Sequence, residues 1–196
     1  EIWDQLGLDK FWSERIDSGK SPVEFSKVLK LMAVNRLIKP GSELYIHQHW
    51  FNQTAMASLL DCDYEAASKD RLYRCLDRIV VYKDELCKYL SDKWQMMFNI
   101  EYDVLLYDIT STYFEGLCKS NPKAKFGHSK DRRSDCRQVL VALVVTPDGF
   151  PLNYEVLAGN TSEKTTLKPL LNKIESKYGK AGRVWLMDRG IPTESV

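Results

Sequence analysis

Two aspartates, Asp108 and Asp188, follow apolar runs of the same kind and are candidates for divalent-metal chemistry. The apolar block Val104–Tyr107 runs into Asp108, and the block Val184–Met187 runs into Asp188. A buried carboxylate without a partner is costly or takes up a proton, so each aspartate should meet a cation, a hydrogen-bonding network or solvent. Two strands that end in Asp at the same end of a sheet can hold Mg²⁺, which prefers hard oxygen ligands and keeps positions open for a substrate phosphate.

Asp108 also has a purely structural alternative. The hydroxyl residues Thr110, Ser111 and Thr112 follow it directly. Their side chains could bind the carboxylate as the chain leaves a strand that is buried on both faces. The stretch around Asp108 leaves both interpretations open, and the second aspartate favours the metal site.

The elements that must position these aspartates read as strand, strand, strand, helix and strand. Because parallel strands are joined by right-handed crossovers, the first and fourth strands can lie parallel and adjacent, with both aspartates at the same end. The turn Pro147–Gly149 separates the second strand from the third. The expected strands are Val104–Tyr107, Gln138–Thr146, Leu152–Leu157 and Arg183–Met187, and the expected helix is Glu163–Tyr178.

Several motifs in this order resemble the catalytic core of a DDE-type insertion-sequence transposase with an RNase H-like fold. The resemblance covers roughly residue 103 to the end, and the helical region before it resembles the N-terminal half of the same family. The motifs are Tyr107–Glu115, Gly127–Asp131, Asp148–Leu152 with Glu155, Gly159–Glu163 and Met187–Gly190.

The resemblance implies an α/β (α+β) fold, with a helical N-terminal region over residues 1–100 and an RNase H-like mixed-sheet core over residues 101–196. It makes Asp108 the first catalytic and metal-binding aspartate and Asp188 the second, with Mg²⁺ or Mn²⁺ as the cofactor. The third acid of the family, a downstream Glu, has no counterpart, because Glu194 is too close to Asp188. With Glu1 as first residue and Val196 as last, we expect a fragment whose core is incomplete at the C-terminus.

The implied function is metal-dependent hydrolysis of a phosphodiester at the ends of an insertion sequence, followed by strand transfer into target DNA. The implied partners are double-stranded DNA, both element ends and target, and a second copy of the full-length enzyme in a homodimer. With two of three acids, the fragment is expected to be inactive alone. The alternatives are a non-catalytic DNA-binding or interfering fragment, and an RNase H-like nuclease that cleaves without joining.

A basic segment connects the first two expected strands and is a candidate DNA-binding loop. Residues 119–137 hold seven cationic side chains against Asp131 and Asp135, a balance of 7 − 2 = +5. Such a loop can neutralise DNA phosphates near the metal site, and its alternative is a mobile, solvated insertion. The cationic residues are Lys119, Lys123, Lys125, Lys130, Arg132, Arg133 and Arg137.

Residues 1–99 read as helices, and two of their features could bind ligands. Arg71, Arg74 and Arg78 share one helical face, which could lie along phosphates or could be a solvated face held by intrahelical ion pairs. The ion-pair interpretation is favoured, because acidic residues are interleaved. The pair His47 and His49 is two residues apart in a helical stretch, where the side chains do not face each other, so it is a poor metal site.

The composition excludes several classes of protein. With 44% apolar and 28% charged residues, the chain has the makeup of an ordinary globular protein. The net charge of +1 says nothing about partners. No apolar run approaches the length of a membrane span. The five cysteines include no C-x-x-C pair, which favours a reduced, cytoplasmic protein without zinc or a disulfide framework.

Overall fold

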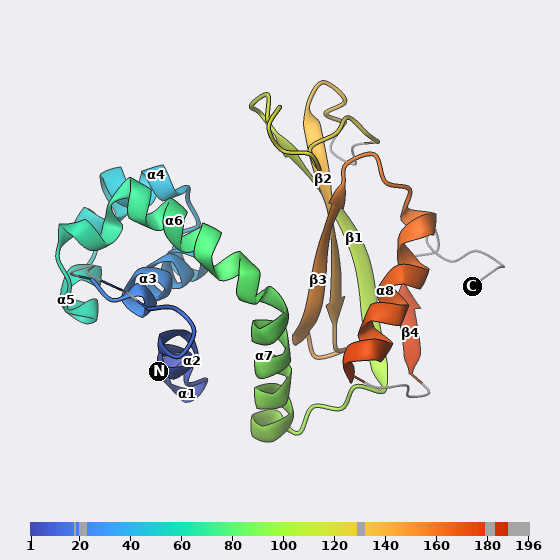
Figure 1. Ribbon diagram of the computed structural model, residues 1–196, viewed down its shortest axis with the longest axis horizontal. Helices are drawn as coiled ribbons and strands as arrows, with labels where there is room; N and C mark the ends of the chain where they lie inside the picture. Colours follow the sequence, from blue (N-terminus) through green and yellow to red (C-terminus); the bar gives the residue numbers. More distant parts are fainter. Residues whose placement is uncertain (18, 20–22, 129–131, 179–182, 188–196) are drawn as a thin grey trace. The chain divides into compact units, whose positions relative to one another are not determined.

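The computed structural model of the chain describes residues 1–17, 19, 23–128, 132–178 and 183–187 (Figure 1). The chain forms two compact units, Glu1–Leu86 and Cys87–Val196. The division falls within α7 (Lys83–Phe98). The functional division expected between residues 100 and 101 stays a prediction. Within the described ranges, no helix has both the length and the apolar character to cross a membrane.

The first unit is helical, as the sequence predicts. Ser42 caps α4, since its Oγ accepts a hydrogen bond from the Tyr45 backbone N–H at 3.1 Å. After this cap the chain forms α4, a π turn and a 3-10 turn in succession. The elements are α1 (Ile2–Gln5), α2 (Leu8–Ser13), α3 (Phe25–Ile38), α4 (Glu43–Tyr45), η1 (Ile46–Trp50), η2 (Phe51–Gln53), α5 (Met56–Leu60), η3 (Tyr64–Ala67), α6 (Lys69–Ile79) and η4 (Val80–Tyr82).

Aromatic side chains form much of the core of this unit. Trp12 is 2% exposed and meets the Phe11 ring edge-on, with the ring centroids 4.9 Å apart. Its ring also lies 6.0 Å from that of Phe25 at the start of α3. Offset and edge-on ring pairs of this kind add to the free energy gained from burial. Phe11 and Trp12 are therefore core residues of this unit.

The second unit is built on a four-stranded mixed sheet in the order β3-β2-β1-β4. β1 pairs antiparallel with β2 and parallel with β4, and β2 pairs antiparallel with β3. The expected adjacency of the first and fourth strands is thus confirmed, as is the α+β fold class, with helices followed by a mixed sheet. The strands are β1 (Val104–Phe114), β2 (Arg137–Val145), β3 (Pro151–Ala158) and β4 (Val184–Met187).

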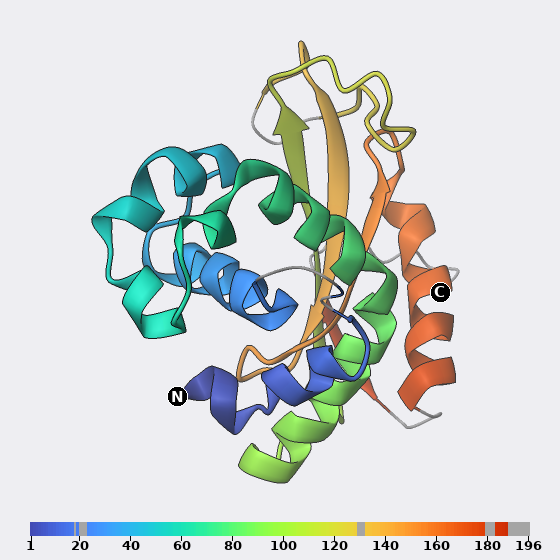
Figure 2. The ribbon, with the colours of Figure 1, turned by 60° about the vertical axis from the view of Figure 1, so that its left-hand side comes forward.

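One face of this sheet is covered by α8 (Glu163–Tyr178), which has the bounds expected from the sequence (Figures 1 and 2). Leu170 and Ile174 of α8 pack against the buried side chains of the strands. This packing fixes which residues of each strand face inward, because side chains alternate between the two faces. The inward-facing residues of the strands are Leu105, Tyr107, Ile109, Leu140, Ala142, Val144 and Leu152.

The turn between β2 and β3 is held by α7. Gly149 takes a φ of +86°, a conformation that favours glycine, and its N–H donates to the Thr146 carbonyl at 2.9 Å. Phe150, next in the turn, stacks against Trp94 and Phe98 of α7 at centroid distances of 5.3 and 5.2 Å. The part of α7 from Cys87 onward thus belongs to the same packed unit as the sheet.

Candidate active site and nucleic-acid interface

Asp108 lies in the middle of β1, not at its end. The strand runs for 11 residues, Val104–Phe114, and continues six positions beyond Asp108. The expectation of a short strand buried on both faces is wrong, since buried and exposed residues alternate along β1. The β-branched residues after Asp108 extend the strand, with Ile109 facing the core and Thr110 facing solvent. Asp108 is therefore an exposed carboxylate on the sheet face opposite α8.

A single hydroxyl partner orients the Asp108 side chain. Thr110 Oγ1 donates a hydrogen bond to Asp108 Oδ2 at 3.2 Å. Ser111, which the structural alternative would place on the same carboxylate, points to the other face and is 7% exposed. No ion pair to Asp108 occurs among the residues that the structure describes. The carboxylate thus keeps open positions for a cation.

The surroundings of Asp108 are apolar and open. A cavity of about 350 Å³ reaches the carboxylate, and Asp108 is the one acidic residue among its described lining residues. Leu143 on β2, the register partner of Asp108, is 41% exposed, and Leu186 on β4 is 49% exposed. The other lining residues are Leu106, Tyr107, Val145 and Met187. This face can therefore receive a large ligand.

The second aspartate, Asp188, lies outside the described residues, which stop at Met187 in this part of the chain. The pairing of β4 with β1 is defined up to Met187. Leu106 pairs with Leu186 and Tyr107 with Met187 in the parallel ladder between β1 and β4. In the sequence, one Asp follows Tyr107 and another follows Met187.

Within the described ranges, no group of three or more His, Cys, Asp or Glu side chains is placed so that it could hold a metal ion. His47 Nδ1 lies 3.1 Å from the Ala67 carbonyl oxygen, so its ring is engaged with the backbone. Glu155, which belongs to one of the motifs that resemble the transposase family, forms an ion pair with Lys173 of α8. The five cysteines are free thiols.

The basic segment between β1 and β2 is a pinned loop in its described part, not a mobile insertion. Lys125 and Gln138 exchange backbone hydrogen bonds of 3.1 and 2.8 Å, and the Gly159 N–H donates to the Lys123 carbonyl at 3.0 Å. The buried amide of Gln138 donates to the carbonyls of His128 and Gly159. The loop is therefore anchored both to the start of β2 and to the end of β3.

Two glycines make this anchoring possible. A Cβ on Gly127 would lie 2.0 Å from the Gly159 oxygen, and a Cβ on Gly159 would lie 2.0 Å from the Gln138 oxygen. Real Cβ atoms do not approach backbone oxygens so closely, so only glycine fits at either position. Gly127 and Gly159 begin two of the motifs that resemble the transposase family, whereas no pattern in the sequence marks Gln138.

Some cationic side chains of this loop bind other groups of the protein, and the others are exposed to solvent. Lys123 Nζ donates to the Val156 carbonyl at 2.6 Å, and the Arg137 guanidinium donates to the Ala124 carbonyl at 3.0 Å. Arg133 makes two bonds to Asp135, of 2.9 and 3.0 Å. Lys130 lies outside the described residues. The exposed cationic side chains in the described part of the loop are Lys119, Lys123, Lys125 and Arg132, and no hydrogen bond or ion pair is described for the side chains of Lys119, Lys125 or Arg132.

The contact between Arg133 and Asp135 changes the ionisation of the acid. The guanidinium hydrogen bonds hold the pKa of Asp135 at about 2, below its ordinary value of 3.8. The same contact raises the pKa of Arg133. The Arg133 guanidinium also lies 4.8 Å from the ring centroid of Tyr113. One positive charge of the loop is thus neutralised internally.

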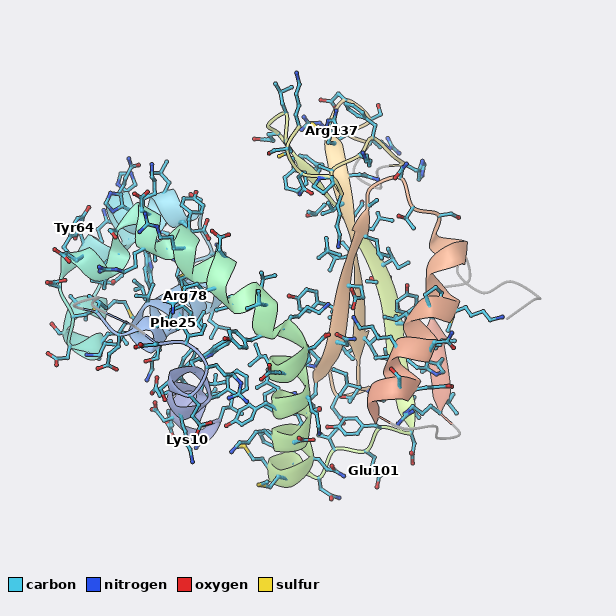
Figure 3. The ribbon with its side chains drawn as sticks, viewed as in Figure 1. Lys10, Phe25, Tyr64, Arg78, Glu101 and Arg137 are labelled. Atoms are coloured by element: carbon cyan, nitrogen blue, oxygen red, sulfur yellow. The ribbon has the colours of Figure 1, made fainter. Side chains whose placement is uncertain are left out.

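The loop joins β2 well away from Asp108. Phe114 pairs with Arg137 at the start of β2, and 114 − 108 = 6 residues separate Phe114 from Asp108. At the rise of an extended strand, this separation is about 20 Å. Figure 3 shows Arg137 at the end of the sheet where β2 begins. The point where the loop joins β2 is therefore distant from Asp108, whereas Lys123 reaches back along the sheet to the Val156 carbonyl. The role of the loop in DNA binding stays a prediction.

The arginine row of α6 is engaged mainly with residues outside that helix. Arg71 donates to the Glu65 carbonyl and lies 3.7 Å from the Glu65 carboxylate. Arg78 donates to the Asp17 carbonyl, and its guanidinium lies 5.0 Å from the ring centroid of Phe25, beside which it is drawn in Figure 3. Arg74 is exposed. The favoured interpretation predicted intrahelical ion pairs with the interleaved acids of α6, and the described partners of Arg71 and Arg78 lie outside that helix instead.

Comparisons with known proteins give a weak likeness to transposases. No protein-family model and no curated protein matches the chain. Among solved structures, the chain is similar to the Mos1 transposase paired-end complex with left transposon end, at 13% identity and a TM-score of 0.30, over 93% of this chain and 58% of that chain. It is also similar to the Mos1 mariner paired end complex with Mn, at 15% identity and a TM-score of 0.27, over 95% and 59% of the two chains.

This chain therefore spans less than three fifths of the length of those transposases. Because both TM-scores are low, the fold assignment rests on the strand order and pairing of the sheet.

Proposed function

We propose that this chain is part of a DDE-type DNA transposase and supplies two of its catalytic acids, Asp108 and Asp188. The parallel pairing of β1 with β4 is the observation that carries the proposal. Leu106 and Leu186 are register partners, both outside the core beneath α8. Asp108 and Asp188 each stand two positions later in the sequence, and side chains two positions apart in an extended chain share a face. Two acids remote in sequence would thus meet beside one another.

The chemistry of the donor set fits Mg²⁺ or Mn²⁺. Asp108 offers a hard carboxylate oxygen on an exposed face, with no competing cation among its described neighbours. The bound ions would supply Lewis-acid activation of a phosphodiester and neutralisation of its charge. Thr110 holds one carboxylate oxygen at 3.2 Å and so fixes the rotamer from which the other oxygen is presented. A third acidic ligand is needed for a complete site of this class.

The proposed substrate is double-stranded DNA at the end of an insertion sequence. The apolar face around Asp108 is open, and the exposed cationic side chains of the loop would contact DNA phosphates. Hydrolysis would free a 3′-hydroxyl, which would attack target DNA in line. The complete enzyme would work as a homodimer.

The metal site can be tested on this chain by iron-directed cleavage of its backbone. Fe²⁺ bound in place of Mg²⁺ generates hydroxyl radicals that cut the polypeptide near the ion. We expect cuts near residue 108 and near residue 188, both lost in Asp108→Asn and in Asp188→Asn. Asp148→Asn, in the turn between β2 and β3, is the matched control and should cut like the wild type. Cuts at one aspartate that persist when the other is changed would show that the two do not share an ion.

The reaction class can be tested in the complete gene product that contains this chain. Asp108→Asn should abolish Mg²⁺-dependent nicking of labelled element ends and leave duplex binding intact. A nuclease without strand transfer would cleave the ends and never join them to target DNA. A DNA-binding module without catalysis would show neither reaction, and its salt-sensitive duplex binding would survive Asp108→Ala.

A further inference from the structure

Phe126 is an exposed aromatic residue in the middle of the basic loop. Its side chain is 56% exposed, whereas Ala124, two positions earlier, is fully buried. The ring therefore lies on the surface of a loop that carries exposed cationic side chains, where a ligand can reach it.

The ring is held in place from one side. The Arg137 guanidinium lies 5.2 Å from the Phe126 ring centroid, and the same guanidinium is fixed by its hydrogen bond to the Ala124 carbonyl. The residue before Phe126, Lys125, is locked to Gln138 by the two backbone bonds. A ring that is already positioned costs little further entropy when it binds a ligand.

We propose that Phe126, supported by Arg137, is a stacking site for an unpaired nucleobase. Aromatic rings flanked by cations are the usual means of binding single-stranded nucleic acid, because every base has a π face that can stack. The bases of an intact duplex already stack on one another, so the occupant is an unpaired nucleotide. The exposed cationic side chains of the loop would contact the phosphates of the same strand. This inference rests on the proposed function and specifies which part of a DNA substrate the loop binds.

The position of the ring sets where in the substrate this nucleotide lies. The loop joins β2 about 20 Å from Asp108 along β1. At about 3.4 Å per nucleotide of a strand, this distance corresponds to roughly six nucleotides from the phosphate at Asp108. The site therefore binds an opened or overhanging base near the substrate end, away from the bond that reacts.

The test measures DNA binding by the full 196-residue chain. The probe is a duplex with a single-stranded tail that carries 2-aminopurine, whose fluorescence is quenched when it stacks. We expect quenching with the wild type and with Phe126→Trp, and none with Phe126→Ala, which should bind the tailed probe roughly tenfold more weakly. Binding to a blunt duplex should be unchanged. Leu117→Ala, in the same loop and 74% exposed in the wild type, is the control for loss of an exposed apolar side chain.

The outcomes separate this inference from the proposed function. If Phe126→Ala quenches like the wild type, or weakens tailed and blunt probes equally, base stacking is refuted. The triple variant Lys119→Ala, Lys125→Ala and Arg132→Ala should weaken both probes and reduce the salt dependence of binding. If Phe126→Ala has no effect while the triple variant does, the loop still binds DNA through phosphates alone. If neither changes binding, the loop does not bind DNA, and its part in the proposed function also fails.

Discussion

Asp108 and Glu155 lie on opposite faces of the same sheet. Asp108 pairs with Leu143, whose side chain is exposed, whereas Glu155 pairs with Ala142, which is 1% exposed beneath α8. The ion pair of Glu155 with Lys173 places that carboxylate on the α8 side. The two acids cannot therefore bind one metal ion, although both belong to motifs that resemble the transposase family.

Glu155→Gln should leave metal binding unchanged. The substitution removes the partner of Lys173 on a partly exposed face, so we expect a loss of about 1 kcal/mol or less in the free energy of unfolding. Asp108→Asn should show the reverse pattern, with unchanged stability and lost Mn²⁺ binding. Urea unfolding and Mn²⁺ electron paramagnetic resonance measure the two quantities. Weaker Mn²⁺ binding by folded Glu155→Gln would contradict the assignment of faces.

Thr110→Val should weaken metal binding without affecting the fold. The hydroxyl of Thr110 orients the Asp108 carboxylate, and partners of this kind typically contribute about 10- to 100-fold to metal affinity. Thr112→Val is the matched control, since Thr112 is also exposed on β1 and two positions farther from Asp108. The dissociation constant for Mn²⁺ is the measurement. Equal affinities in the two variants would show that the hydroxyl has no orienting role.

The sheet could be predicted from the sequence because its signals are local. Apolar runs separated by Pro147–Gly149 mark β2 and β3, and the helical pattern of Glu163–Tyr178 gives α8 with its exact bounds. The parallel pairing of β1 with β4 follows from the chirality of crossover connections. These features need no knowledge of distant side chains.

The surroundings of Asp108 and the loop could not be predicted, because they depend on distant contacts. The apolar block before Asp108 looks like a doubly buried strand, yet Leu143 of β2 and Leu186 of β4 leave that face open. The pinning of the loop depends on Gln138, whose amide bonds a carbonyl 21 positions away at Gly159. Sequence periodicity carries no signal for such a long-range hydrogen bond.

Gly159→Ala should destabilise the second unit and release the basic loop. The new methyl group would lie 2.0 Å from the Gln138 carbonyl oxygen, so the backbone of β2 or of the loop must shift. Overpacking of this kind typically costs about 1–3 kcal/mol. Gly116→Ala is the control, since nothing lies within 4 Å of a Cβ at that position. Limited proteolysis should cut the loop faster in Gly159→Ala alone, and equal rates in both variants would refute the pinning.

Arg133→Gln should raise the pKa of Asp135 from about 2 toward its ordinary value of 3.8. Because the folded pKa is depressed, the pair stabilises the loop above the ordinary value, and this contribution is lost as the pH falls toward 2. Carboxyl NMR at pH 3.5 should find Asp135 largely ionised in the wild type and about half protonated in the variant. Arg132→Gln, at the neighbouring exposed cation, should titrate like the wild type. If Asp135 titrates identically in all three proteins, the charge of Arg133 is not held by Asp135 and is available to DNA.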